Sequence, residues 1–143
     1  MNDHMGYFPQ TRGNDCGIAC ILMIADYFFE KTQIRTKSLN HIKIPETGMS
    51  IQDMEKAAEE MGLNVCPLKS EQKKEALLSG ISTPFIAHIS NAFNYQHYVV
   101  ISKIAGSKIF IWDPDPEIGK YWTLVDTFLT NWTGYLLIFK KPE

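Results

Sequence analysis

The sequence predicts an α+β domain in which N-terminal helices pack on a C-terminal antiparallel β-sheet. The first half of the chain contains two helical patterns of apolar residues, at residues 18–29 and 51–61. From Pro84 onwards the apolar residues occur in short β-rich runs that are separated by turn residues. Helices that precede the strands, instead of alternating with them, are typical of the α+β class. With 143 residues, the chain has the length of one domain.

The composition excludes several classes of protein. Hydrophobic residues make up 45% of the chain, and the net charge of −2 provides no broad basic field for nucleic acid. The N-terminus lacks the pattern of a signal peptide, and no apolar run reaches the roughly 18 residues that span a bilayer. The odd number of cysteines (Cys16, Cys20 and Cys66) favours reduced thiols. The sequence therefore indicates a soluble, cytosolic type of chain.

The two long helices are predicted from apolar spacing and from their terminal residues. The first buries a face with helical spacing, formed by Ile18, Ile21, Leu22, Ala25 and Phe28. Either Asn14 or Asp15 is expected to cap its first turn with a side-chain oxygen. In the second helix, Ser50 and Asp53 have the spacing of an N-terminal capping box, and Gly62 ends the helix.

The remaining elements are short. Helices are expected at residues 36–42, 71–79 and 125–131, and strands at residues 64–68, 84–89, 97–104, 108–112, 119–122 and 134–139. Pro67 favours an edge position for its strand, because proline cannot donate to a neighbouring strand. The turn at residues 105–107 predicts an antiparallel hairpin in which the numbers of paired residues sum to about 211 or 212. This register brings Asp113 within diagonal reach of His97, at the open end of the hairpin.

Cys16 lies at the start of the first helix, in a setting that suits a nucleophile. The free amides and the macrodipole, of about +0.5 charge at that end, favour the thiolate form. Asp15 opposes this effect unless its carboxylate points away. A small buried core residue is the ordinary alternative for a cysteine at this place. The groups that could activate the thiol therefore decide between the two interpretations.

His97 and Asp113 are the candidates for activating the thiol. A carboxylate that accepts from one imidazole nitrogen selects the tautomer, and it leaves the other nitrogen to face the thiol. Taken singly, Asp113 before Pro114 is compatible with an ordinary turn residue, and His97 with a structural or exposed histidine. Their joint placement favours His97 as the base and Asp113 as its orienting partner.

Together, the motifs resemble the C39 family of papain-like cysteine peptidases. The resemblance rests on Gln10, on Asp15-Cys16-Gly17 followed by an apolar helix, on His97-Tyr98-Val99-Val100 and on Asp113-Pro114. Members of this family form the N-terminal domain of bacterial ATP-binding cassette exporters that mature and secrete bacteriocins, lanthipeptides and related peptides. The resemblance covers nearly the whole chain. It implies a papain-like fold and a single peptidase domain at residues 1–143, from the N-terminus of a longer exporter.

The resemblance also implies roles, a substrate and partners. Cys16 would be the nucleophile, His97 the general base and then acid, Asp113 the orienter of the imidazole, and Gln10 a side-chain donor to the oxyanion. No cofactor or metal is implied. The substrate would be a precursor peptide cut after a Gly-Gly or similar pair, with its leader docking partly as an amphipathic helix on an apolar surface. The other partners would be transmembrane and nucleotide-binding domains, at the cytoplasmic face of the bacterial membrane.

Three alternatives stay open. The chain could be a non-catalytic module that binds leaders and recruits cargo to an exporter. It could also transfer the acyl group to another acceptor, as transglutaminase-like and isopeptidase enzymes on similar folds do. A metal site is the weakest option, because Cys16 and Cys20 lack a second ligand pair with zinc spacing. We expect Cys20 and Cys66 to be core residues, and His88 to be structural.

Overall fold

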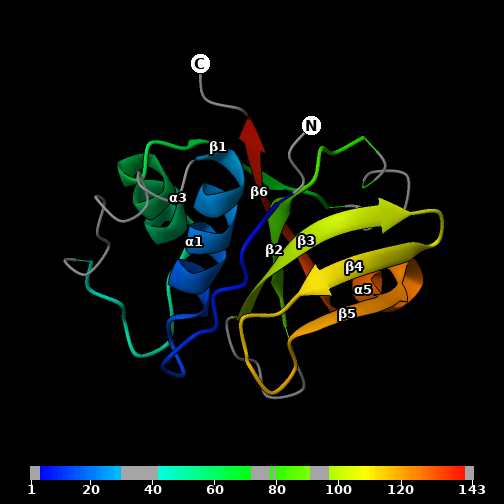
Figure 1. Cartoon of the computed structure of the whole chain (residues 1–143), viewed down its shortest axis with the longest axis horizontal. Coiled ribbons are helices and arrows are strands. Elements are labelled where there is room, and N and C mark those ends of the chain that lie inside the picture. Colours follow the sequence, from blue (N-terminus) through cyan, green and yellow to red (C-terminus); the bar gives the residue numbers. More distant parts are fainter. Residues whose placement is uncertain (1–3, 30–41, 72–77, 79, 91–96, 141–143) are drawn as a thin grey trace.

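The computed structural model describes residues 4–29, 42–71, 78, 80–90 and 97–140 (Figure 1). Its helices are α1 (Cys16–Phe28), α3 (Ile51–Glu60) and α5 (Val125–Asn131). Its strands are β1 (Asn64–Lys69), β2 (Phe85–Ile89), β3 (His97–Ala105), β4 (Lys108–Trp112), β5 (Lys120–Leu124) and β6 (Trp132–Lys140). The helices predicted at residues 36–42 and 71–79 lie almost entirely outside the described residues. Within the described part of the chain, no helix is both long and apolar enough to cross a membrane.

The strands form one six-stranded sheet in the order β1-β6-β2-β3-β4-β5. Every neighbouring pair is antiparallel. All six strands follow α1 and α3 along the chain, so the predicted α+β class is confirmed. Pro67 lies in β1, which is an edge strand as predicted, and pairs with Leu137 of β6.

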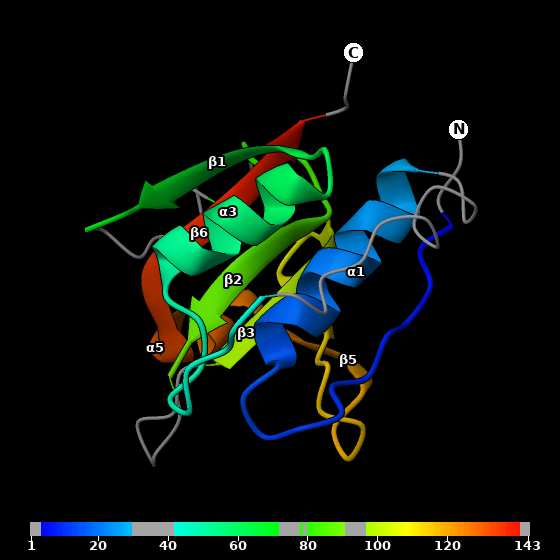
Figure 2. The same ribbon diagram turned by 90° about the vertical axis from the view of Figure 1, so that its left-hand side faces the viewer.

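The two faces of the sheet belong to two separate cores. Helices α1 and α3 cover one face, where α3 packs over β1 and α1 packs over β3 (Figure 2). Helix α5 packs against the other face. Side chains alternate along β3, so Tyr98 and Val100 join the α1 core while Val99 and Ile101 join the α5 core. Both faces of β3 are therefore buried, which makes this strand a rigid support for His97 at its first residue.

The cap of α1 differs from the prediction. The helix begins at Cys16, so the expected position of this cysteine at the helix start is confirmed, but Asp15 occupies the N-cap position without a side-chain capping bond. The Asp15 carboxylate instead accepts from Thr11 and Arg12 in the preceding loop. The Asn14 side chain donates to Pro45 O at 3.0 Å. The expected side-chain cap is thus wrong, because partners outside the helix compete for both polar side chains.

The second helix agrees with its prediction at both ends. Ser50 Oγ accepts from Asp53 N at 3.1 Å, and Asp53 Oδ2 accepts from Ser50 N at 3.2 Å, which completes the capping box. Gly62 follows with a φ of +85°, a left-handed conformation that favours glycine. These signals are local, so their interpretation needs no knowledge of the tertiary structure.

Close packing of α1 on α3 depends on Gly17, the residue after Cys16. A Cβ atom at this position would lie 2.4 Å from Met54 Sδ and 3.4 Å from Met49 Sδ. Glycine therefore allows α3 and the segment before it to approach the end of α1 that carries the cysteine.

The hairpin of β3 and β4 has nearly the predicted register. Ala105 pairs with Lys108 next to the turn, so the paired numbers sum to 213 there instead of 211 or 212. An irregularity between Ile101 and Lys103 shifts the pairing, and Val100 pairs with Trp112, which restores the predicted sum of 212. The prediction is wrong by one residue at the turn and right at the open end, where His97 and Asp113 lie.

Candidate active site

His97 and Asp113 are in direct contact at the open end of the hairpin. His97 Nε2 and Asp113 Oδ1 are 2.8 Å apart, and the two side chains are 19% and 3% exposed. A hydrogen bond between charged groups that is this well shielded from water is stronger than one at the surface. The diagonal contact expected from the hairpin register is therefore present.

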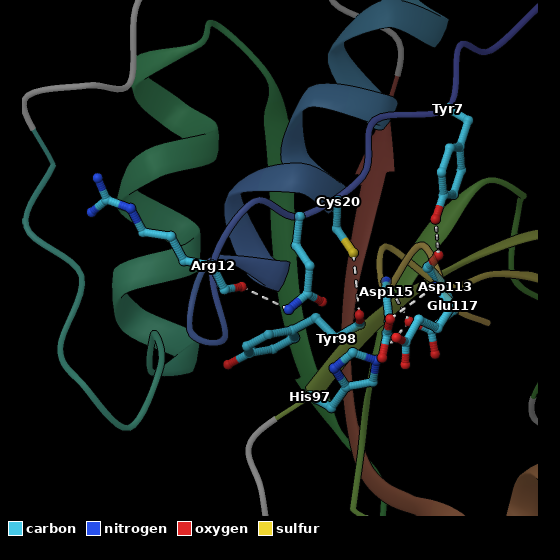
Figure 3. A network of polar contacts seen from close by, with 9 residues as sticks. Tyr7, Arg12, Cys20, His97, Tyr98, Asp113, Asp115 and Glu117 are labelled. Carbon is cyan, nitrogen blue, oxygen red and sulfur yellow. Dashed lines mark hydrogen bonds and ion pairs between the residues drawn. The ribbon is translucent and has the colours of Figure 1, made fainter. Parts of the chain in front are cut away.

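Asp113 is held in place through its side chain and its backbone (Figure 3). Its Oδ1 atom also accepts from Asp115 N at 2.8 Å. Its backbone N–H donates to Gly119 O at 3.0 Å, and its carbonyl oxygen accepts from the Tyr7 hydroxyl at 2.6 Å. These contacts leave the carboxylate little freedom, so its orientation toward His97 is built into the loop that follows β4.

The surroundings of His97 favour its protonated form. Burial lowers the pKa of the imidazole, but hydrogen bonds to Asp113 and to Cys16, and the charges of the same two groups, raise it to about 10. Because Nε2 is engaged with Asp113, Nδ1 is the ring nitrogen that remains for the hydrogen bond with Cys16. An imidazolium placed between a carboxylate and a thiol stabilises the thiolate, which is the nucleophilic form.

Cys16 is placed by the packing of α1 on β3. Its side chain is buried, and one turn further along the helix the Cys20 thiol donates to Tyr98 O at 3.4 Å. This contact fixes the helix against the residue that follows His97, so Cys16 lies beside the imidazole. The pKa of Cys20 is raised, first by burial and then by the charges of Cys16 and Asp113, so Cys20 keeps its proton.

Cys66 lies in an exposed position away from Cys16 and Cys20, which are both buried. Cys20 is fully buried, as predicted, but Cys66 is exposed, so the expectation that it is a core residue is wrong. Cys66 lies in the edge strand β1, where the alternate residue Val65 packs on the α1 core. Strand alternation at an edge explains the exposure of Cys66.

Gln10 lies in the loop before α1, next to the segment that follows Asp113. Its backbone N–H donates to Pro114 O at 2.8 Å, which ties the loop to the segment after Asp113. Its side-chain Nε2 donates to Arg12 O at 2.8 Å, while its Oε1 is buried without a hydrogen-bond partner among the described residues. One of the two amide hydrogens thus supports the loop, and the second is left to serve another acceptor.

Tyr7 belongs to the site although no sequence pattern singled it out. Besides its bond to Asp113 O, its ring lies 6.4 Å from the ring of Trp112. The pKa of its hydroxyl is raised, first by burial and then by the charges of Asp113 and Asp115. A lone aromatic residue in an extended segment has no spacing signal, so only the folded contacts reveal it.

Comparison with known proteins assigns the chain to a family. The profile of the peptidase C39 family matches residues 4–143. The lactococcin-G-processing and transport ATP-binding protein LagD of Lactococcus lactis subsp. lactis is 36% identical over 139 residues. That alignment covers 94% of this chain and 18% of the relative. The chain thus spans less than a fifth of the length of the curated relatives it matches.

Two solved structures share the fold. The crystal structure of the peptidase domain of Streptococcus ComA, a bi-functional ABC transporter involved in quorum sensing, matches with a TM-score of 0.80 at 24% identity, covering 98% of this chain and 100% of that domain. A double glycine motif protease from an AMS/PCAT transporter, solved in complex with the leader peptide, matches with a TM-score of 0.75 at 26% identity, covering 99% of this chain and 94% of that one. The fold is papain-like, and the chain belongs to the peptidase C39 family of cysteine peptidases.

Proposed function

We propose that the chain removes N-terminal leader peptides from bacteriocin-like or lanthipeptide-like precursors, by cutting after a double-glycine pair. Cys16 is the nucleophile, His97 the general base and acid, Asp113 the orienter of His97, and Gln10 a donor to the oxyanion. The observation that carries the proposal is the buried contact of 2.8 Å between His97 and Asp113, next to Cys16 at the start of a helix.

Acylation is the first half of the proposed reaction. The Cys16 thiolate attacks the carbonyl carbon of the second glycine, and the carbonyl oxygen becomes an oxyanion that accepts a hydrogen bond from Gln10. The carbon–nitrogen bond then breaks, and the His97 imidazolium gives its proton to the leaving amine. The mature peptide departs with a new amino terminus, while the leader stays on Cys16 as a thioester.

Deacylation restores the enzyme. Neutral His97 takes a proton from a water molecule, whose oxygen attacks the thioester carbon. The carbon–sulfur bond breaks, which restores the thiolate beside the imidazolium, and the leader leaves as a carboxylic acid that gives its remaining proton to the solvent. Asp113 accepts a hydrogen bond from His97 Nε2 throughout the reaction, so Nδ1 faces the reacting atoms in both acylation and deacylation.

Leader docking is proposed on a surface beside the catalytic groups. This aromatic surface consists of Phe110, Trp112, Trp122 and Leu124, on the face of β4 and β5 that lies on the α1 side of the sheet. Trp122 and Leu124 are 48% and 51% exposed, and the rings of Phe110 and Trp122 are stacked 4.8 Å apart. Trp112 directly precedes Asp113, so a peptide bound here leads toward His97.

The occupant of the aromatic surface is proposed to be the amphipathic helix of the leader. A helix can cover such a strip with its apolar face. Three exposed lysines lie on the same strands or on the neighbouring strand: Lys103 on β3, Lys108 on β4 and Lys120 on β5. Lys120 Nζ is 4.0 Å from the centre of the Trp112 ring. A leader that fits the aromatic surface and the lysines beside it is therefore expected to carry acidic residues next to its apolar face. The solved leader complex of a protease 26% identical to this chain supports this choice of partner.

Replacing Trp122 by alanine is expected to raise KM for the precursor about thirtyfold or more, with little change in kcat. Loss of a large aromatic contact at the centre of an interface typically costs at least 2 kcal/mol of binding free energy. The contact binds the substrate and the transition state equally, so KM alone responds. Steady-state cleavage of a full precursor measures both constants.

Leu68→Ala is the matched control for Trp122→Ala. Leu68 is 46% exposed, but it lies on β1 at the opposite edge of the sheet. We expect this variant to keep the KM of the wild type. An unchanged KM in Trp122→Ala, or an equal rise in Leu68→Ala, would show that the leader docks elsewhere.

Substrate mapping tests the proposed reaction and separates it from the alternative of a non-catalytic leader-binding module. The purified chain is incubated with a double-glycine precursor and with a version in which both glycines are leucines. We expect a cut after the pair in the first peptide alone, seen by mass spectrometry. A binding module would hold the leader and leave both peptides intact, and a cross-linked product would indicate an acyl-transfer enzyme.

The parent protein is proposed to be an exporter, with this chain as its peptidase domain at the cytoplasmic face of the membrane. The name of the relative LagD describes a processing and transport ATP-binding protein, and that of Streptococcus ComA a bi-functional ABC transporter. The partners of the domain would then be the transmembrane and nucleotide-binding domains of the same exporter.

A further inference from the structure

Asp15 organises the loop between Gln10 and the start of α1. Its Oδ1 atom accepts from Thr11 N at 3.1 Å and from Arg12 N at 2.9 Å. Its Oδ2 atom accepts from Thr11 Oγ1 at 2.7 Å and from Thr11 N at 3.2 Å. A carboxylate that accepts several backbone hydrogen bonds holds their donors in one arrangement. The side chain of the residue before Cys16 therefore closes the loop on itself.

The same loop is the support of the Gln10 side chain. Gln10 Nε2 donates to the carbonyl oxygen of Arg12, whose own N–H donates to Asp15. The Gln10 backbone N–H is held by Pro114 O. The amide of Gln10 is thus positioned through Arg12, and the position of Arg12 depends on Asp15.

We propose that Asp15 is a positioning residue for catalysis, whose carboxylate holds Thr11 and Arg12 so that the Gln10 amide is kept beside Cys16. This inference rests on the proposed role of Gln10 as oxyanion donor. The geometry explains why Asp15 occupies the N-cap position of α1 without capping it: its acceptors are engaged by the loop.

The charge of Asp15 provides a way to separate positioning from an effect on the thiol. A negative charge next to Cys16 disfavours the thiolate, so its removal leaves alkylation of Cys16 unchanged or makes it faster. Loss of positioning acts in the opposite direction on peptide cleavage, because the oxyanion is then less well stabilised. Loss of positioning therefore slows peptide cleavage, whereas loss of the negative charge leaves the alkylation of Cys16 unchanged or makes it faster.

The test uses Asp15→Asn and Asp15→Ala in a Cys66→Ser background, which removes the exposed thiol. We expect the single-turnover rate of precursor cleavage, at saturating enzyme, to fall about tenfold to a hundredfold in Asp15→Ala. Asparagine keeps one acceptor oxygen, so Asp15→Asn should lose less. Iodoacetamide should alkylate Cys16 in both variants at least as fast as in the parent.

A double-mutant cycle shows whether Asp15 acts through Gln10. Gln10→Ala is expected to slow cleavage by about 10² to 10³, as loss of an oxyanion donor does. Adding Asp15→Ala should then cost less than about threefold more, because the group that Asp15 positions is already absent. Thr11→Val, which removes one donor to Asp15 and keeps the backbone, should give a smaller loss in the same direction. Asp126→Ala, an exposed carboxylate in the first turn of α5, should match the parent.

Each other outcome overturns the inference. It is wrong if cleavage and alkylation fall together, if the losses of Asp15→Ala and Gln10→Ala multiply, or if Asp15→Ala cleaves at the parent rate. When Gln10→Ala slows cleavage and Asp15→Ala does not, only the inference fails. When Gln10→Ala itself cleaves at the parent rate, the oxyanion role in the proposed function fails, and the inference falls with it.

Discussion

Replacement of Cys16 by alanine is expected to abolish cleavage of a double-glycine precursor, with a loss of roughly 10⁶-fold. Removing the nucleophile of a triad hydrolase has an effect of this order, and the residual rate comes from binding and oxyanion stabilisation alone. Neither of the other cysteines can take its place. Cys20 is buried with a raised pKa, and Cys66 lies in the edge strand β1. Mass spectrometry of the reaction mixture over time measures the rate.

Two further variants test whether the loss of cleavage in Cys16→Ala is due to the thiol of Cys16. Cys16→Ser keeps the size of the side chain and removes the thiolate, so it should be nearly as inactive as Cys16→Ala. Cys66→Ser removes an exposed thiol and should retain the activity of the wild type. Measurable turnover in Cys16→Ala, with product cut at the same bond, would mean that the nucleophile is another group.

Replacement of Asp113 by asparagine is expected to lower kcat by roughly 10⁴-fold, the effect seen when the orienting carboxylate of a triad is lost. The asparagine side chain can present its NH₂ group to His97 Nε2, which favours the wrong tautomer. His97 is then less able to hold a proton for the leaving amine. The KM for the precursor should stay close to that of the wild type, because Asp113 is 2% exposed and does not line the aromatic surface.

The pH dependence of stability provides a second measurement of the same contact. The folded-state pKa of His97, about 10, lies above the value of roughly 6.5 expected in the unfolded chain. The folded protein therefore holds one more proton between these values, and the free energy of unfolding falls as the pH rises through this range. The stabilisation from His97 is complete below about pH 6.5 and is lost as the pH passes the folded pKa of about 10.

Asp113→Asn should lower the folded-state pKa of His97, because the variant lacks the hydrogen bond to Asp113, the first of the interactions that raise this pKa. The pH-dependent loss of stability should then be smaller, and it should be complete closer to pH 6.5. Chemical denaturation of both proteins between pH 6 and 10 measures the difference. Identical pH profiles for wild type and variant would show that the contact does not hold the proton on His97.

Local signals explain which parts of the fold could be predicted. The capping box of Ser50 and Asp53 spans three residues, and the contact of His97 with Asp113 follows from one hairpin turn. In both cases the interacting residues are joined by a short segment whose geometry the sequence restricts. The contact of Cys16 with His97 is different, because the two residues come from separate elements. The residue patterns made His97 the candidate base for Cys16, and the resemblance to a known family added support for this pairing.

Competing hydrogen-bond partners and strand position explain the predictions that were wrong. Either Asn14 or Asp15 was expected to cap α1, but the Asp15 carboxylate accepts from Thr11 and Arg12 in the preceding loop, and the Asn14 side chain donates to Pro45 O. Cys66 was expected in the core, but its strand lies at the edge of the sheet with Val65 facing inward. A sequence pattern shows whether a side chain is polar or apolar. Which groups that side chain contacts depends on how the surrounding chain folds.

The aromatic surface could not be assigned for a related reason. Phe110 alternates with buried residues and Trp122 with partly buried ones, and such a pattern is equally compatible with a second core. In the structure, α3 packs over β1 and α1 over β3, while Trp122 on β5 remains 48% exposed. The extent of a helix layer over a sheet depends on tertiary packing, which the strand pattern does not contain.

The most direct test of the catalytic role of Cys16 is an acid quench during a single turnover. The purified chain is mixed with a double-glycine precursor, stopped after short times and analysed by mass spectrometry with peptide mapping. We expect the leader to be attached to Cys16 through a thioester, together with an equal amount of the released mature peptide. Release of the mature peptide with no adduct on Cys16 under conditions that slow deacylation, or leader binding with no cleavage at all, would contradict this account.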